Sequence, residues 1–305
     1  MARTKQHRFA AITKHKQLYL LLIIPMVYII VFAYVPMAGL TMAFEQFTIT
    51  KGMFASPWVG FANFQRFFSS VYFMRTVRNT LYLSVLGIVF NMPFSILLAL
   101  CLNELKNGFR KRFVQLVTYA PYFISTVVMV SMLSQWTELT TGLVNHAIRL
   151  FGGSPVDFMG KVKYFRFLYT ASGIWQYMGF NSIVYLAAFN GIDQQLHEAA
   201  IVDGATRLQR VRHIDLPGIL PTVVIMLILS CGRILSVGFE KVYLMQKSSN
   251  LEHSQIISTY LYEMGLKKQD VSYGTAVGMF NSLVNFTLVL IVNSISRRLG
   301  ETSLW

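Results

Sequence analysis

The chain contains 305 residues, of which 54% are hydrophobic and only 13% are charged. Soluble globular proteins usually carry about 25% charged residues, so this composition argues against a soluble domain and predicts a polytopic membrane protein. The formal net charge of +14 would suggest nucleic-acid binding in a soluble protein. Here Lys- and Arg-rich cytoplasmic flanks of a membrane protein explain it more simply, and no nucleic-acid partner is expected.

The N-terminus carries a basic stretch, MARTKQHRFAAITKHKQLYL, that resembles the charged region of a signal peptide. The apolar block that follows it continues past Val35 without a small-residue cleavage site. We therefore interpret this block as a retained transmembrane span.

Six apolar blocks are long enough to cross a bilayer, because a spanning helix needs about 20 mostly apolar residues. In chain order they cover residues 18–44, 79–102, 113–136, 167–189, 219–237 and 275–295. The first block contains Pro25 and Pro36 and is long enough to leave the bilayer before it ends. The sequence thus predicts an all-α polytopic membrane protein with six transmembrane helices.

The distribution of Lys and Arg orients these spans. The two termini, the loop ELKNGFRKRF and residues 190–218 hold fourteen of them in short segments. Three longer loops on the other side (45–78, 137–166 and 238–274) hold twelve. The higher density predicts that both termini are cytoplasmic, together with the polar segment between spans four and five.

Polar residues inside the spans should face the bundle interior or a wet cavity, because they are costly in hydrocarbon. Span two offers Ser84, Asn91 and Ser95. In spans four and six, polar and small residues recur every three or four positions, which places them on one helical face. They are Thr170, Gly173, Tyr177, Asn181 and Tyr185 in the fourth span, and Gly274, Gly278, Asn281 and Asn285 in the sixth. Packing between helices is the alternative interpretation of each face.

Arg233 lies within the apolar segment ILSCGRILSVGFEKV, seven residues before Glu240. A charge inside a span is a functional hypothesis by default. The alternative is a structural pair with Glu240, which falls on the same side of an ideal helix.

Motifs of enzymes are absent from the sequence. It contains no GxxxxGK[ST] phosphate loop, no HExxH and no GxSxG, and its six histidines are scattered over loops and tails. Cys101 and Cys231 both lie in apolar runs, which argues against a disulfide framework or a zinc site. We therefore expect a protein that is not an enzyme and that binds no metal.

The segment between spans four and five, EAAIVDGATRLQRVRHIDLPGILP (198–221), combines acids and arginines between apolar blocks. Residues 194–203 are compatible with a short amphipathic helix, and Gly204 allows a turn with positive φ. TRLQRVRHIDL could form a second short helix before Pro217 and Pro221, at the entry to span five. This shape favours docking into a partner protein; an amphipathic loop on anionic lipid is the alternative.

This segment resembles the EAA loop of binding-protein-dependent ABC importer permeases, with the pattern E-A-A-x-x-D-G-A and, beginning nine positions after its last alanine, I-x-L-P. The matching positions are Glu198, Ala199, Ala200, Asp203, Gly204, Ala205, Ile214, Leu216 and Pro217, and Gln209 is a frequent choice in the family. Val211 departs from the phenylalanine often found at its position. YVPMAGLTMAFEQF (34–47), SPWVGFANFQRFF (56–68), LEHSQIISTYLYEMGL (251–266) and the terminal SLW resemble a carbohydrate subgroup that imports oligosaccharides or polysaccharide fragments, alginate-like ones in some members.

The resemblance implies a domain organisation. RNTLYLS (78–84) looks like the opening of the permease core, which would cover residues 79–296 with five spans and the EAA loop at 194–221. A basic cytoplasmic tail (1–17) and the first span with an extracytoplasmic loop (18–78) would precede the core, and a cytoplasmic tail (297–305) would follow it.

The resemblance also implies partners in a bacterial cytoplasmic (inner) membrane. They would be a second, similar permease in a heterodimer, two ATPase subunits and an extracytoplasmic binding protein. ATP and Mg would bind to the ATPases, and this chain would hold no cofactor. Residues 198–205 of the EAA helix and turn would couple ATP-driven closure of the ATPases to alternating access of the spans.

In relatives that import maltose, the spans flanking the EAA loop hold the sugar in one of the two permeases. Mapped onto this chain, the substrate pathway would include Gly173, Trp175, Gln176, Tyr177, Asn181, Ser230 and Arg233. Arg233 would suit a carboxylate, which suggests an acidic glycan. The alternatives are a substrate site in the partner permease, a different cargo such as an amino acid, peptide or phosphate, and a channel-like protein without an ATPase.

Overall fold

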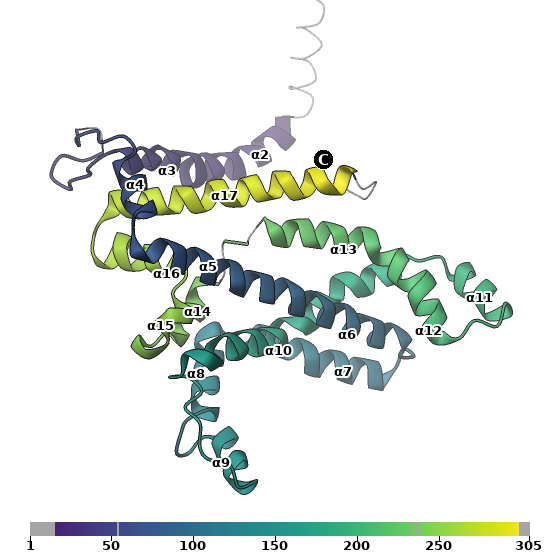
Figure 1. Ribbon diagram of the computed structural model, residues 1–305. Coiled ribbons are helices and arrows are strands. Elements are labelled where there is room, and N and C mark those ends of the chain that lie inside the picture. The colour runs from purple at the N-terminus through teal and green to yellow at the C-terminus, as the bar shows by residue number, and fades with distance from the viewer. Residues whose placement is uncertain (1–15, 54, 233, 236–237, 299–305) are drawn as a thin grey trace, which may run out of the picture. The chain divides into compact units, whose positions relative to one another are not determined.

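The computed structural model describes residues 16–53, 55–232, 234–235 and 238–298. Apart from an isolated bridge between Glu45 and Trp58, the regular structure of these residues is helical, as the sequence predicts (Figure 1). The chain divides into two compact units. Unit 1 comprises residues 1–68 and 264–279, and unit 2 comprises residues 69–263 and 280–305.

Unit 1 begins with a helical run made of α2 (Lys16–Ile29), the π-helical η1 (Ile30–Tyr34), α3 (Val35–Met37) and the 3-10 helix η2 (Ala38–Phe44). Residues 17–44 of this run are long and apolar enough to span a membrane. The remaining elements are α4 (Ala62–Phe68), the end of the π-helical η7 (Tyr262–Lys267) and the start of α17 (Val271–Arg298).

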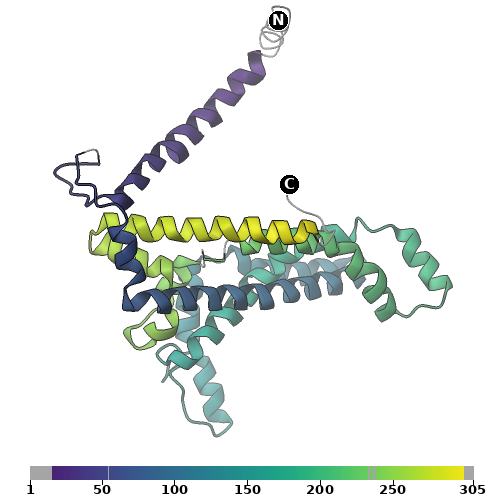
Figure 2. The same ribbon diagram turned by 45° about the horizontal axis from the view of Figure 1, so that its top comes forward.

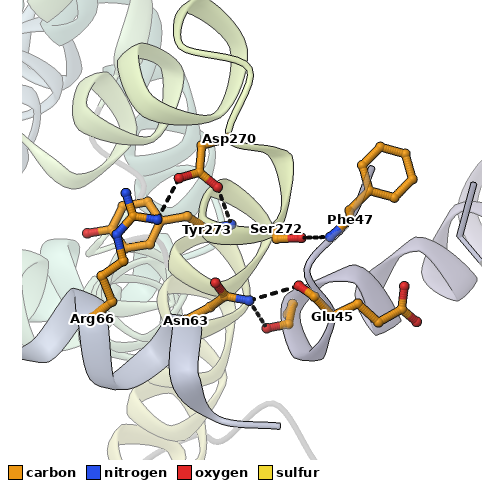
Figure 3. Close-up of polar contacts among 8 residues, drawn as sticks. Glu45, Phe47, Asn63, Arg66, Asp270, Ser272 and Tyr273 are labelled. Atoms are coloured by element: carbon orange, nitrogen blue, oxygen red, sulfur yellow. Dashed lines mark hydrogen bonds and ion pairs between the residues drawn. The ribbon is translucent and has the colours of Figure 1, made fainter. Parts of the chain in front are cut away.

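Two sequence segments of the carbohydrate subgroup, 34–47 and 56–68, pack on each other in unit 1. The Phe44 ring stacks on Trp58 with their centroids 5.5 Å apart. Asn63 Nδ2 donates hydrogen bonds to the carbonyls of Ala43 and Glu45 (Figure 3). The start of α17 joins the same cluster in three ways. Arg66 pairs with Asp270 at 2.6 Å and lies 4.3 Å from the Tyr273 ring, and Ser272 Oγ accepts a hydrogen bond from the Phe47 amide.

Unit 2 holds most of the helices. Their bounds are α5 (Val71–Leu86), η3 (Gly87–Asn91), α6 (Met92–Glu104), α7 (Phe109–Tyr119), η4 (Ala120–Phe123), α8 (Thr126–Trp136), α9 (Leu143–Leu150), α10 (Val162–Phe189), α11 (Gln194–Val202), α12 (Arg207–Arg210), η5 (Val211–Asp215), α13 (Leu216–Cys231), α14 (Phe239–Met245), η6 (Ser248–Asn250), α15 (Leu251–Ser254) and α16 (Ile257–Leu261). Residues 280–298 of α17 complete the unit.

Two apolar clusters hold unit 2 together. One joins α5, α8, α10 and α14 through residues that include Leu83, Phe165 and Val242. The other joins α6, α10 and α13 through residues that include Ala99, Tyr185 and Ile219. Because α10 contributes to both clusters, it connects the two halves of the core of unit 2 (α10 is labelled in Figure 1).

Asn79, in the RNTLYLS motif, is a buried polar link between three helices. Its Nδ2 donates to the carbonyls of Glu252 (2.8 Å) and Gln255 (3.1 Å), and its Oδ1 accepts from Arg166 at 3.2 Å. These bonds tie α5 to α15 and α10. Within the RNTLYLS motif, Asn79 therefore has a structural function, because it links neighbouring helices.

Three π-helical turns allow helices to continue past a proline. Proline lacks a backbone N–H, and its ring crowds the carbonyl four residues earlier. In each case that earlier residue lies in the middle of a wider π turn, which moves the carbonyl aside. The turns are η1 before Pro36, η3 before Pro93 and η5 before Pro217. The helical run 17–44 consequently continues through Pro36.

The second short helix predicted between residues 206 and 216 does not end before span five. Instead, α12, η5 and α13 form one apolar helix over Arg207–Cys231, because the η5 turn accommodates Pro217. The span predicted over 219–237 thus begins earlier than expected, and its last two residues, 236 and 237, lie outside the described residues.

The predicted span 113–136 is not one helix. Its two parts, Phe109–Phe123 and Thr126–Trp136, meet at an angle of 100°. Pro121 lies in the 3-10 turn η4, Ile124 is extended, and Ser125 caps α8 by accepting a hydrogen bond from the Val128 amide. This local chemistry ends one helix and starts the next.

Four helices of the described chain are long and apolar enough to cross a membrane, and the bent pair makes a fifth candidate if it is counted as one span. The segment α10 is 28 residues long but is not among them. Its polar face, predicted from Thr170 to Tyr185, lowers its hydropathy. By the length and composition of its described helices, the chain is therefore a multi-helical membrane protein with four or five apolar candidate spans.

Candidate functional site

A cavity of about 450 Å³ lies in unit 2 among α5, η3, α6, α10, α13 and α14. This volume is within the range of small-molecule binding pockets. The polar residues that line it are Ser84, Asn91, Ser95, Tyr169, Thr170, Tyr177, Asn181, Tyr185, Ser230 and Lys241. The polar faces predicted in spans two and four thus meet at one cavity, which favours the wet-cavity interpretation over simple packing for both of them.

Several cavity hydroxyls donate to carbonyls of their own helix. Ser95 Oγ donates to the Asn91 carbonyl and Ser230 Oγ to the Met226 carbonyl, both at 2.7 Å, and Ser84 donates to Thr80 at 2.8 Å. Their oxygen lone pairs can therefore accept hydrogen bonds from a ligand.

Two cavity residues contribute polar atoms without a partner. Among the described residues, nothing hydrogen-bonds to the buried Oδ1 of Asn91 or Oγ1 of Thr170. Unpaired buried polar groups are unfavourable.

Gly173 opens the middle of the cavity. A Cβ atom at this position would lie 3.4 Å from Lys241 Nζ and 3.7 Å from Asn91 Nδ2. These are ordinary contact distances, so the glycine is not required by sterics. Its absent side chain leaves the two nitrogens facing one shared space.

Lys241 is the one buried Lys or Arg of the described residues, with 6% of its surface exposed. Its Nζ donates to the Tyr169 carbonyl at 3.0 Å and lies 4.9 Å from the Tyr169 ring centroid. Lys241 belongs to α14, which lies outside the candidate spans. Burial lowers the pKa of its ammonium group to about 7. Sequence analysis missed this residue, since a lysine just beyond a predicted span carries no signal of burial.

The proposed substrate-pathway residues separate into three groups. Gly173, Tyr177, Asn181 and Ser230 line the cavity. Trp175 and Gln176 do not. The Trp175 ring lies 6.4 Å from Trp136 beside an apolar groove between α8 and α10, and Gln176 Nε2 donates to the Ile124 carbonyl at the bend. The remaining one, Arg233, lies outside the described residues.

The EAA-like residues form a helical hairpin that projects from the end of unit 2 where α13 begins (Figures 1 and 2). Asp193 caps α11, which carries Glu198, Ala199 and Ala200. The helix stops at Gly204, whose φ is +78°, and its last carbonyls accept from the amides of Gly204 and Ala205. The predicted positive-φ turn is thereby confirmed.

Thr206 begins the return helix with a capping box. Its side chain accepts from the Gln209 amide, while Gln209 Oε1 accepts from the Thr206 amide at 2.7 Å. The frequent family choice of glutamine at position 209 therefore has a local physical reason. On the other arm, His197 Nε2 lies 3.4 Å from the buried Asp215 carboxylate and braces α11 against η5.

The outer surface of α11 is exposed. Glu198, Ala199 and Asp203 are exposed, and so are the apolar side chains of Ile201 (56%) and Val202 (86%). A short, well-capped helix with apolar and acidic groups on its surface is suited to docking against a partner protein.

Comparisons with known proteins place these features in a family context. Residues 91–301 match the family described as the binding-protein-dependent transport system inner membrane component. The polygalacturonan/rhamnogalacturonan transport system permease protein YteP of Bacillus subtilis is 40% identical over 292 residues, which cover 96% of this chain and 91% of YteP. Protein LplB of the same organism is 39% identical over 296 residues, which cover 97% of this chain and 93% of LplB.

A solved structure shares both sequence and fold with the chain. It is a crystal structure of a bacterial ABC transporter involved in the import of the acidic polysaccharide alginate. One of its chains is 39% identical to this protein with a TM-score of 0.90, and the match covers 96% of this chain and 99% of that chain. A related structure, with 38% identity, contains the alginate transporter with an alginate pentasaccharide-bound periplasmic protein.

Proposed function

The chain belongs to the family of binding-protein-dependent transport system inner membrane components, and from this premise we propose that it is the permease subunit of an ABC importer for oligosaccharides or polysaccharide fragments. The observation that carries the proposal is the cavity of unit 2, whose hydroxyl, amide and phenol groups match the surface of a glycan. Two of the similar proteins support this cargo class: YteP, a polygalacturonan/rhamnogalacturonan transport system permease protein, and the transporter involved in the import of alginate.

The importer would lie in the bacterial cytoplasmic membrane with both termini of this chain in the cytoplasm. The spans would be the four apolar helices, the bent pair, and α10. Although α10 is less apolar, its 28 residues extend about 42 Å at 1.5 Å per residue, which is longer than a hydrocarbon core of about 30 Å. Its polar side chains face the cavity instead of lipid, so they do not prevent it from spanning.

In this arrangement the α11 hairpin docks into a cleft of an ATPase subunit in the cytoplasm. Glu198 would form a charge-assisted contact with a basic side chain of the ATPase. Gly204 would supply the tight turn that presents α11, and residues 199, 200, 203 and 205 would complete the contact. Because α12, η5 and α13 form one helix, a displacement of the hairpin would move α13 and thus one wall of the cavity.

The complete importer would contain a second permease, two ATPases that bind ATP and Mg, and an extracytoplasmic binding protein. Closure of the ATPases around ATP would turn the cavity from inward- to outward-facing, and the binding protein would then deliver the glycan. This chain would hydrolyse no ATP itself.

The coupling role of α11 can be tested by reversing one charge and by straining one turn. We expect Glu198→Lys and Gly204→Asp to leave insertion and assembly intact but to lower glycan uptake per ATP hydrolysed at least tenfold, measured in proteoliposomes of the whole complex. Glu252→Lys, at an exposed carboxylate expected on the opposite membrane face, is the matched control. Normal coupling ratios in both hairpin variants would refute the docking role.

The cavity can be tested with two aromatic residues of α10 that lie two positions apart. Tyr177 lines the cavity, whereas Trp175 borders the groove beside α8. We expect Tyr177→Leu to raise the apparent KM for glycan uptake several-fold and Trp175→Leu to leave it within about twofold. Equal effects of the two substitutions would place the pathway elsewhere, such as in the partner permease.

An acidic cargo is the narrower part of the proposal. One relative is named for the transport of polygalacturonan and rhamnogalacturonan, and one solved structure for the import of the acidic polysaccharide alginate. In this chain, the buried Lys241 lines the cavity. The competing possibility, a neutral or non-carbohydrate cargo, predicts that uptake by the reconstituted complex is saturated by neutral sugars, amino acids or peptides and not by an oligouronate.

A further inference from the structure

The position of Lys241 is unusual for a lysine. Lysine is rarely fully buried without a charged partner, because desolvation of the ammonium group is costly. Lys241 is 94% buried, and it forms no ion pair with any described acidic residue. A side chain kept in such a place needs a compensating interaction.

The hydrogen bond from Lys241 to the Tyr169 carbonyl does not by itself supply that compensation. Tyr169 lies inside the helix α10, where its carbonyl accepts the amide proton four residues later. The lysine is thus not required to satisfy this carbonyl. An ammonium group has three donors, and this contact uses one of them.

The remaining donors face a space that they share with Asn91. Lys241 Nζ and Asn91 Nδ2 both lie within 3.7 Å of the point where a side chain of residue 173 would begin. A cation and an amide N–H that converge on one space form a site for a carboxylate, since charge-assisted hydrogen bonds are the stronger ones. The unpartnered hydroxyl of Thr170 and the phenol of Tyr177 line the same cavity.

We propose that Lys241, assisted by the Asn91 amide, binds a carboxylate of the passing glycan and thereby selects cargo that contains uronate residues. Lys241 is a specificity-determining residue of the cavity, and this role rests on the function proposed above. Gly173 serves the site by leaving room for the sugar carboxylate between the two nitrogens.

The protonation of Lys241 gives this recognition a pH dependence. Burial lowers the pKa of the ammonium group to about 7, whereas a glycan carboxylate stays ionised through this range. Below pH 7 the lysine is charged and binds the carboxylate; above pH 7 it becomes neutral and the attraction is lost. The helices packed against α14 are α8, α10 and α16. Their titratable side chains are Lys163, Tyr164, Arg166, Tyr169, Tyr177 and Tyr185 of α10 and Tyr260 of α16, while α8 has none and α14 itself adds Glu240 and Tyr243.

A variant that differs only at position 241 isolates the pH dependence that belongs to Lys241. An arginine at this position stays charged through the range. Lys241→Arg therefore separates the charge from the titration.

The test uses the whole complex in proteoliposomes with its binding protein, and alginate pentasaccharide and an oligogalacturonate as probes. We expect Lys241→Gln to raise the apparent KM for the probe at pH 6.5 at least tenfold. Lys247→Gln, at an exposed lysine of the same connection, is the matched control and should stay within twofold of wild type. The ratio of wild-type to Lys241→Arg uptake should fall as external pH rises from 6 to 8.5.

If Lys241→Gln fails to assemble, the pH ratio with Lys241→Arg decides the question. Gly173→Ala offers a second measurement, because a methyl group enters the shared space at an ordinary contact distance and should raise the apparent KM. An unchanged KM in Lys241→Gln, or a constant ratio across pH for Lys241→Arg, overturns the role of Lys241 while uptake by wild type continues. A wild-type complex that imports neither probe contradicts the proposed acidic cargo itself.

Discussion

The contact between α7 and α10 depends on the absence of a side chain at Gly179. A Cβ atom at this position would lie 1.9 Å from the Thr118 carbonyl oxygen and 2.4 Å from its carbon. Real Cβ contacts are essentially never shorter than 3.0 Å, so Gly179→Ala must separate the two backbones by about 1.1 Å. Backbone atoms cannot rotate aside as a side chain can. Close approach through small residues is the usual basis of helix packing in membranes.

Overpacking of this kind typically costs about 1–3 kcal/mol, while alanine gains about 0.5–1 kcal/mol over glycine within a helix. We therefore expect Gly179→Ala to destabilise the protein by about 1 kcal/mol, measured as a lower midpoint of unfolding in detergent. Gly87→Ala is the matched control, because no heavy atom lies within 4 Å of its Cβ position and its midpoint should not fall. Equal midpoints for Gly179→Ala and wild type would refute the close packing of α7 on α10.

Three further substitutions test particular contacts by the same unfolding measurement. Asn79→Ala removes three hydrogen bonds that a fully buried side chain makes to α10, to α15 and to the residue after α15, and it should destabilise the protein by about 2–4 kcal/mol. A change below about 1 kcal/mol would contradict its linking role. Thr206→Ala removes the capping box with Gln209 and should lower the free energy of unfolding by about 1 kcal/mol. It should also lower the coupling of ATP hydrolysis to uptake, and unchanged coupling and stability would show that the cap is dispensable. Arg66→Ala should cost less than about 1 kcal/mol because the Arg66 side chain in the pair with Asp270 is 55% exposed, and a larger loss would mean that this pair is more important than its exposure indicates.

The polar faces of spans two and four were predictable because their spacing follows the helical repeat. Residues 91 and 173 are far apart in the chain, yet both belong to faces that avoid lipid, and the structure brings them to one cavity. The positive φ of Gly204 was predictable for a similar reason, since glycine after a helical run is a common C-terminal stop.

Other features depend on tertiary packing and left no signal in the sequence. Lys241 looked like an ordinary loop residue, and only the arrangement of α14 against α10 buries it. The bend after Pro121 needs the Gln176 amide to satisfy the Ile124 carbonyl, a partner 52 residues away. The continuous helix through Pro217 depends on a π turn, which residue periodicity does not reveal.

In the predicted sixth span, contacts within the protein account for two of the polar and small residues on the predicted face. Packing between helices was the alternative interpretation of its small residues, and Gly274 does approach Gly265, with only 2.7 Å between its Cβ position and the Gly265 Cα. Asn285, on the same predicted face, accepts a hydrogen bond from the Leu235 amide at 2.9 Å. For these two residues, close packing and a hydrogen bond to the turn after α13 explain the predicted face without a ligand.

The central claim, that this chain conducts a glycan in an ATP-driven importer, is tested most directly by uptake of radiolabelled alginate pentasaccharide or oligogalacturonate. Proteoliposomes would contain this chain, its partner permease and the ATPase subunits, with ATP inside and the binding protein outside. We predict accumulation above the external concentration only when both ATP and the binding protein are present. Equilibration of either probe without ATP would instead indicate a channel, and an absence of uptake under all conditions would contradict the proposed cargo.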